Sequence, residues 1–266
     1  MSTFQGRTFD CIPSPPDHRN WQLADLLAAK VTRSPSERLQ DAQIAALAKR
    51  VTALEAPVPP TPPIPPVPPT PPVPGGAVLF DVPVDLDQGA EGECVGFGTT
   101  HAILGSPNGS KTVSQQILDN PTAETIYQNA QKIDGQTPDE QSGTSVLAGL
   151  KAAKALGLIV AYHQAASMAE VQQAFVTGVG GALWGTDWHQ DMMNPDASGQ
   201  IHVTGPVVGG HCYWTRGYDP ATDQYLIHNS WGTGWGRNGD ALISSADLAK
   251  LLAASGEAWL VTKSAS

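Results

Sequence analysis

Residues that together could cleave a bond to a carbonyl group lie far apart in this sequence of 266 residues. Cys94 follows a glycine-rich stretch and precedes a run of residues that can enter a buried helix. A helix N-terminus favours the thiolate, the nucleophilic form of cysteine, because it presents N–H groups and a partial positive charge. Gln88 lies six residues earlier, and its side-chain N–H could bind an oxyanion together with the Cys94 backbone N–H. The alternative for Cys94 is a small buried apolar residue.

A cysteine nucleophile needs a base, and the base needs a group that orients it. His211 follows two glycines and begins a predicted strand, and Asn229 lies at the end of the next predicted strand. If these strands are antiparallel neighbours, Asn229 can accept a hydrogen bond from the imidazole nitrogen that faces away from the sulfur. His228 competes with His211 for the role of base. The remaining histidines are expected to be structural or solvated: His101, His163, His189 and His202.

Composition and charge exclude several classes of protein. The net charge of −10 argues against binding to nucleic-acid backbones or anionic membranes. No apolar run is long enough to span a bilayer, and residues 1–30 lack the pattern of a secretory signal. Three cysteines without metal-ligand spacing predict neither a metal site nor a disulfide scaffold, and allow at most one disulfide. The compartment stays open between the cytoplasm and a virion.

The first 56 residues divide into two parts. Residues 1–33 form an N-terminal segment that includes the polar and aromatic stretch PDHRNW at 16–21. Residues 34–56 are predicted to contain an amphipathic helix, whose apolar residues at 37–55 follow alternating spacings of three and four, as in a short coiled coil. This helix either mediates homo-oligomerisation or lays its apolar stripe on the main domain.

Residues 57–76 form a predicted linker. Within it, 57–74 repeat two prolines and one other residue, which excludes a helix or a central strand and predicts polyproline II of about 55 Å. The tract acts either as a semi-rigid spacer or as a docking site for a proline-recognising domain.

Residues 77–266 are predicted to form one α+β domain with a helical lobe, a lobe of antiparallel strands and a cleft between them. The helical pattern lies mainly in the first half of this domain and the strand pattern in the second. The predicted helices are 94–104, 122–132 and 145–156, and the predicted strands are 182–184, 207–218 and 225–230.

Three segments in this order resemble the papain-like cysteine peptidases: Gln88 and Cys94 separated by five residues, GGHCYWTRGY at 209–218 and HNSWGTGWGRNG at 228–239. The resemblance covers about 77–261 and is closer to bacterial and viral members than to plant or lysosomal ones. It implies the two-lobe papain-like fold. The PPDHRN stretch also resembles a segment that packs on the catalytic domain in bacterial members.

The resemblance implies a role for each matching residue. Gln88 is the oxyanion donor, Cys94 the nucleophile, His211 the general acid and base, Asn229 the residue that orients it, and Trp231 the indole that shields their hydrogen bond. A polypeptide substrate would be hydrolysed through a thioester acyl-enzyme without any cofactor. The substrate cleft would be lined by Gly92, Gly143, Leu183 and Gly210.

The sequence also departs from the family pattern. Val95 replaces the usual tryptophan after the nucleophile, and Glu91 stands where plant and lysosomal relatives have a bridged cysteine. Glu93 adjoins the nucleophile and opposes thiolate formation. The N-terminal region lacks the pattern of the family's inhibitory propeptides, so the sequence does not predict a zymogen.

Three interpretations follow from the sequence. The main one is a cysteine endopeptidase. The second is a catalytically weak or inactive papain-like domain that binds or scaffolds. The third is a papain-fold cell-wall amidohydrolase, of a kind associated with phage tails.

Overall fold

The computed structural model describes residues 2–4, 7–9, 11–14, 76–106 and 118–263. The predicted helix at 34–56, all of the predicted linker except Gly76, and the PDHRNW stretch lie outside the described residues. No helix among the described residues is long and apolar enough to cross a membrane.

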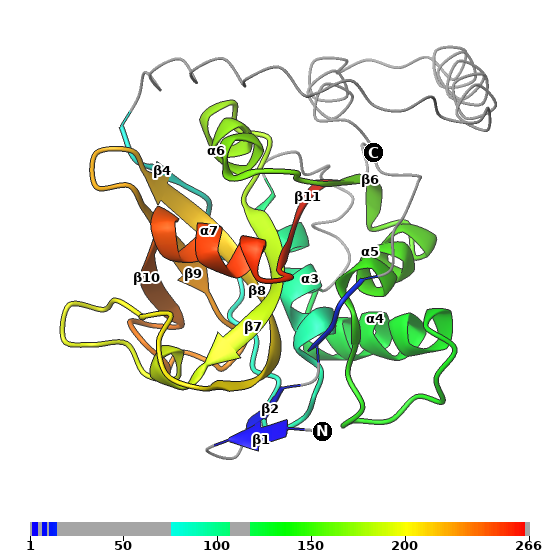
Figure 1. Ribbon diagram of the computed structural model, residues 1–266. Helices are drawn as coiled ribbons and strands as arrows, with labels where there is room; N and C mark the ends of the chain where they lie inside the picture. The colour runs from blue at the N-terminus through cyan, green and yellow to red at the C-terminus, as the bar shows by residue number, and fades with distance from the viewer. Residues whose placement is uncertain (1, 5–6, 10, 15–75, 107–117, 264–266) are drawn as a thin grey trace, which may run out of the picture.

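Three helices form one lobe, to the right in Figure 1: α3 (Cys94–Gly105), α4 (Asn120–Ile133) and α5 (Val146–Ala155). They agree with the three predicted helices. The side chain of Asp119 accepts a hydrogen bond from the backbone N–H of Thr122 at the start of α4, and Ser145 does the same for Ala148 at the start of α5. These caps satisfy N–H groups that have no acceptor within the helix.

The helix α3 is buried along almost its whole length. Two of its glycines allow other elements to approach closely. A Cβ added at Gly96 would lie 2.2 Å from the Ala123 backbone oxygen of α4, and one added at Gly105 would lie 1.8 Å from Cη2 of Trp214. The helix is therefore fixed by close packing on both sides.

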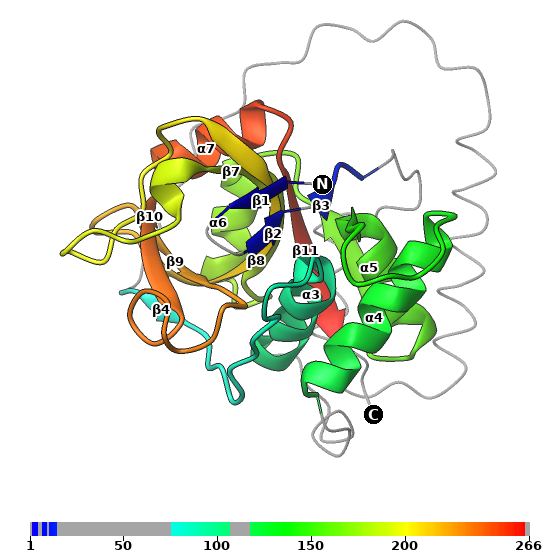
Figure 2. The same ribbon diagram turned by 90° about the horizontal axis from the view of Figure 1, so that it is seen from below.

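The second lobe is a largely antiparallel sheet, ordered β10-β9-β8-β7-β11-β6, with the short β4 (Val78–Leu79) also paired to β8. In Figure 2 the sheet curls around α6 (Met168–Val176), and α7 (Ser245–Ala253) lies along its outside. The main strands are β6 (Ile159–Gln164), β7 (Ala182–His189), β8 (Val207–Asp219), β9 (Gln224–His228), β10 (Asp240–Ser244) and β11 (Glu257–Lys263). The 3₁₀-helix η2 (Gln190–Met192) follows β7.

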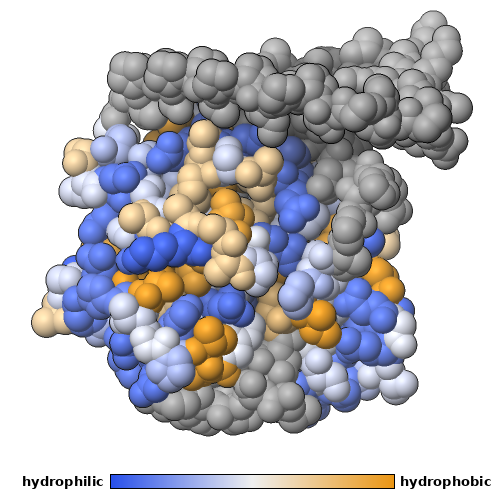
Figure 3. Space-filling view, in the orientation of Figure 1, coloured by the Kyte–Doolittle hydropathy of each residue, from blue (hydrophilic) through white to orange (hydrophobic). Residues whose placement is uncertain are grey.

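The N-terminal residues form short strands that lie against the domain. A hairpin of β1 (Ser2–Phe4) and β2 (Arg7–Phe9) lies in front of the sheet in Figure 2. The next strand, β3 (Cys11–Ile12), pairs in parallel with β5 (Thr144–Ser145) in the helical lobe. On the face shown in Figure 3, apolar residues form separate patches among hydrophilic ones.

Candidate active site

Cys94 is the first residue of α3, and it is 0% exposed. The imidazole of His211 in β8, which is also 0% exposed, lies beside this thiol and acts to lower its pKa. The contact between α3 and β8 therefore joins the helical lobe to the sheet at the two residues predicted to react. The pKa of the Cys94 thiol is raised well above its ordinary value, first by a hydrogen bond with Cys11 and then by burial, while His211 acts in the opposite direction.

The antiparallel pairing of β8 with β9 brings His211 and Asn229 together. His211 donates through Nε2 to Asn229 Oδ1 at 2.9 Å, which leaves Nδ1 of the neutral ring to act as the acceptor. Asn229 Oδ1 also accepts from the backbone N–H of Ser230 at 2.8 Å. The amide is thus held in one orientation, and it holds the imidazole in one tautomer.

Two indoles enclose the imidazole of His211. The Trp231 ring lies 4.8 Å from the His211 ring between centroids, tilted by 32°, and Trp188 of β7 lies edge-on to His211 at 4.8 Å. Both indoles are buried. They exclude water from the hydrogen bond between His211 and Asn229, which strengthens it. Sequence analysis did not identify Trp188, since a tryptophan inside a strand is equally typical of an ordinary core.

The side-chain amide of Gln88 lies beside the N-terminus of α3, and both its nitrogen and its oxygen form hydrogen bonds that hold it there. Its Nε2 donates to the backbone oxygen of Glu91 at 2.9 Å, and its Oε1 accepts from the hydroxyl of Ser230 at 2.6 Å. Because the amide nitrogen carries two hydrogens, the contact with Glu91 occupies only one of them. Ser230, which sequence analysis did not single out, thus links Gln88 to the residue after Asn229.

The residues predicted to line the substrate cleft lie in different settings. Gly92 donates its N–H to the Glu140 backbone oxygen at 2.8 Å, and Gly143, with φ of +64°, donates to the Tyr127 hydroxyl at 3.1 Å. Leu183 is completely buried in β7 and faces α3. Gly210 lies directly under the N-terminal segment, since an added Cβ would be 2.2 Å from the Cys11 backbone oxygen.

Glu93 precedes the nucleophile at the N-cap of α3, and its side chain makes no capping hydrogen bond. The pKa of Glu93 is raised to about 7, first by burial and then by the negative charges of three other glutamates: Glu124, Glu91 and Glu140. This carboxyl is therefore partly neutral at physiological pH, which weakens its opposition to a thiolate at Cys94.

The other described histidines interact with groups other than the nucleophile. His228 bonds through Nδ1 to Asp240 at 2.8 Å and packs edge-on against His101, so His211, rather than His228, contacts Asn229. Further partners are Glu170 for His163, the Gly205 backbone oxygen for His189 and Asp196 for His202. Among the described residues, no group of three or more His, Cys, Asp or Glu side chains could hold a metal ion.

An open pocket of ≈ 660 Å³ lies beside Trp231. Its lining includes the aromatic residues Trp231 and Trp235 and the acidic residues Asp85 and Asp87. The pocket therefore offers apolar contact and negative charge next to the candidate catalytic residues.

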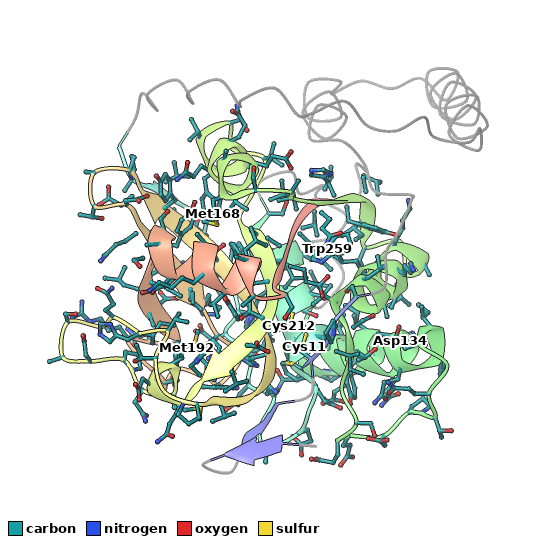
Figure 4. All side chains as sticks on the ribbon, in the orientation of Figure 1. Cys11, Asp134, Met168, Met192, Cys212 and Trp259 are labelled. Carbon is teal, nitrogen blue, oxygen red and sulfur yellow. The ribbon has the colours of Figure 1, made fainter. Side chains whose placement is uncertain are left out.

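The N-terminal segment 11–14 lies over the candidate catalytic residues. The Cys11 thiol lies close to both Cys94 and Cys212, and each of these thiols affects the pKa of Cys11. Figure 4 shows Cys11 and Cys212 side by side where β8 meets the helical lobe. Sequence analysis did not connect Cys11 with the site, because a single cysteine among unpatterned residues gives no sign of its partners.

Comparisons with known proteins agree with this architecture. The structure resembles that of xylellain, a cysteine protease from Xylella fastidiosa, with a TM-score of 0.63, 16% identity, and coverage of 99% of this chain and 98% of that one. It also resembles digestive procathepsin L 3 of Tenebrio molitor (TM-score 0.51, 15% identity, coverage 75% and 73%). A third similar structure is the Carica candamarcensis cysteine protease CMS1MS2 in complex with E-64 (TM-score 0.50, 17% identity, coverage 71% and 99%).

Sequence comparison gives a shorter match. A stretch of 49 residues is 41% identical to cathepsin B of Dictyostelium discoideum, spanning 18% of this chain and 16% of that protein. No family model matches the sequence. The chain therefore has the papain-like cysteine protease fold, as its motifs predicted.

Proposed function

We propose that this protein is a cysteine peptidase that hydrolyses peptide bonds with Cys94 as nucleophile and His211 as general acid and base. The observation that carries the proposal is the position of the Cys94 thiol beside the imidazole of His211, which Asn229 orients through a hydrogen bond, at the N-terminus of a buried helix. An activated nucleophile requires a thiol, a base and an orienting group arranged in this way.

The reaction begins when His211 Nδ1 takes the proton of the Cys94 thiol. The sulfur attacks the carbonyl carbon of the substrate, and the carbonyl oxygen becomes an oxyanion. The Cys94 backbone N–H and the second N–H of Gln88 Nε2 stabilise this charge, and the Ser230 hydroxyl keeps the Gln88 amide in place.

The protonated His211 then gives its proton to the leaving amine, and a thioester remains on Cys94. His211 next takes a proton from a water molecule, which attacks the thioester and releases the new carboxylic acid. Asn229 keeps Nδ1 directed at the sulfur through both steps, because it holds Nε2 as the donor.

The substrate is proposed to be a polypeptide. The pocket between Trp231 and Trp235 supports this, since it places an apolar wall and the carboxylates of Asp85 and Asp87 beside the catalytic residues. A substrate residue with an aliphatic stem and a cationic end fits both walls.

The test is hydrolysis of casein by the reduced protein and its variants. Cys94→Ala should abolish cleavage, whereas Cys212→Ala, which removes another buried thiol, should retain it. His211→Ala should lower kcat by about 10²–10⁴-fold. Asn229→Ala should lower it less, because it misorients the base without removing it.

Three results would contradict the proposal. Full casein cleavage by Cys94→Ala would exclude the nucleophile. Release of peptides from peptidoglycan fragments by a protein that leaves casein intact would instead support the cell-wall amidohydrolase, and inactivity on both would support a binding domain.

A further inference from the structure

All three cysteines of the sequence meet at the candidate active site, although they come from distant parts of the chain. Cys94 begins α3, Cys212 lies in β8 next to His211, and Cys11 lies in β3. The Cys11 thiol lies close enough to both other thiols to change their pKa values, and its sulfur is placed by Gly185 of β7, where an added Cβ would lie 3.3 Å from it. None of the three is engaged in a disulfide.

The segment 11–14 is held by both lobes. On the helical side, Cys11 pairs with Thr144, and the Ser14 hydroxyl accepts from the Leu147 backbone N–H at 2.8 Å. On the sheet side, Ser14 donates to Glu257 Oε1 through its hydroxyl at 2.8 Å and its backbone N–H at 3.2 Å. Figure 1 shows this segment running between the two lobes.

Glycines in the sheet make room for this segment. A Cβ at Gly185 of β7 would lie 3.3 Å from Cys11 Sγ, and one at Gly210 would lie 2.2 Å from the Cys11 backbone oxygen. The segment thus lies directly on β7 and on β8, the strand that carries His211. Cys94 beneath it is 0% exposed. A peptide substrate cannot reach the Cys94 sulfur while the segment is in this position.

We propose that Cys11 and Cys94 form a reversible disulfide that locks the segment 11–14 over the nucleophile, so that the protein is inactive when oxidised and activated by reduction. This regulation rests on the proposed function of Cys94 as nucleophile. The oxidant is a low-molecular-weight disulfide, of which glutathione disulfide is the example used below.

The reaction takes place in two exchanges. Cys11 is partly exposed, and the pKa of its thiol is raised well above the ordinary value, first by Cys212, so alkaline pH is needed to form its thiolate. This thiolate attacks the small disulfide, forms a mixed disulfide and releases one small thiol. Cys94 then gives its proton to His211 and attacks the Cys11 sulfur, and the second small thiol leaves with a proton. In total, the two protein thiols lose two electrons and two protons, and one small disulfide gains them and becomes two thiols.

The surroundings favour Cys94 over Cys212 as the partner of Cys11. Cys94 has His211 beside it as a base for its proton, whereas the pKa of Cys212 is changed by burial and by Cys11, Cys94 and Glu257. The pKa values of all three thiols are raised, so the neighbouring base, and not the pKa, distinguishes Cys94 from Cys212. Cys212 therefore serves as the matched control.

The experiment treats the full-length protein with glutathione disulfide at mildly alkaline pH, blocks the remaining thiols with N-ethylmaleimide and maps the peptides by mass spectrometry. We expect a peptide pair linked through Cys11 and Cys94, with Cys212 alkylated after unfolding. Dithiothreitol should remove the link. Cys212→Ser should form the same link, and Cys11→Ser should instead keep glutathione on Cys94 or remain unmodified.

A wild-type protein that ends as a Cys94–glutathione adduct, or as a Cys11–Cys212 pair, would overturn the proposal. The peptide map needs no enzymatic assay, so it is independent of the proposed function. A Cys11–Cys94 link in a protein that, once reduced, cleaves no casein would support the disulfide and refute the peptidase. If the reduced protein cleaves casein, oxidation should suppress cleavage in the wild type and in Cys212→Ser.

Discussion

Two elements bring a cysteine to the same place in very different ways. The helix α3, which carries Cys94, is buried on nearly every side and packs against both α4 and β8. The strand β3, which carries Cys11, has two residues, and it is held mainly by pairing with β5 and by the hydrogen bonds of Ser14.

This difference indicates that α3, which carries Cys94, is fixed in the fold, whereas the segment 11–14 can be displaced. Moving α3 would expose core side chains of both lobes, at a cost comparable to the stability of the whole domain. Displacing the segment 11–14 removes a few hydrogen bonds and a small contact area, which is the order of cost that ligands and substrates can offset. The nucleophile is therefore rigid and its cover is removable.

The largest expected effect comes from disturbing α3. Gly105→Ala would force a methyl group into Trp214, whose ring lies 1.8 Å from the new carbon position, and we expect a loss of about 3 kcal/mol or more. Urea unfolding measures this loss. Gly76→Ala is the control, because no atom of the described residues lies within 4 Å of its added carbon. Equal stability of the two variants would contradict the tight packing of α3.

A smaller effect is expected from loosening β3. Ser14→Ala removes the hydroxyl that links Leu147 and Glu257, and we expect a loss of about 1 kcal/mol in stability together with faster alkylation of Cys94 by iodoacetamide. The matched control is Ser198→Ala, since the Ser198 hydroxyl bonds only locally to Asp196. An unchanged alkylation rate would mean that the segment does not limit access to the sulfur.

The smallest effect concerns the charge of Glu93 at the start of α3. Its pKa is raised to about 7 in the folded protein, so the folded state binds more protons than the unfolded state between about pH 4.5 and 7. The contribution of Glu93 to stability therefore falls as pH rises through this range. The gain in Tm from Glu93→Gln should be larger at pH 8 than at pH 5. A gain that is larger at pH 5 would refute the assigned direction.

The catalytic candidates could be predicted because each lies in a short motif with its own local signature. Cys94 follows glycines and begins a helix, and His211 and Asn229 lie on neighbouring strands. The prediction of helices was less complete, because it placed them mainly in the first half of the domain and missed α6 and α7 in the second half. The glycine and tryptophan density of that half drew attention to strands and away from these short amphipathic helices.

The role of Cys11 could not be predicted for a physical reason. Its partners are residues distant in the chain, and β3 is too short to show any periodicity. The absence of a propeptide pattern predicted no zymogen, and so gave no reason to expect a segment over the nucleophile. In the structure, backbone pairing with β5 and the space above Gly210 place the segment, and neither depends on a distinctive side-chain pattern.

The most direct test of the central claim is the reaction of the reduced protein with a peptidyl epoxide, which presents a thiol-reactive carbon on a peptide. We predict one covalent adduct, mapped to Cys94, that is lost in Cys94→Ala, greatly slowed in His211→Ala and retained in Cys212→Ala. An adduct on Cys11 or Cys212 with Cys94 unmodified, or no adduct at all in the reduced wild type, would contradict the assignment of Cys94 as an activated nucleophile.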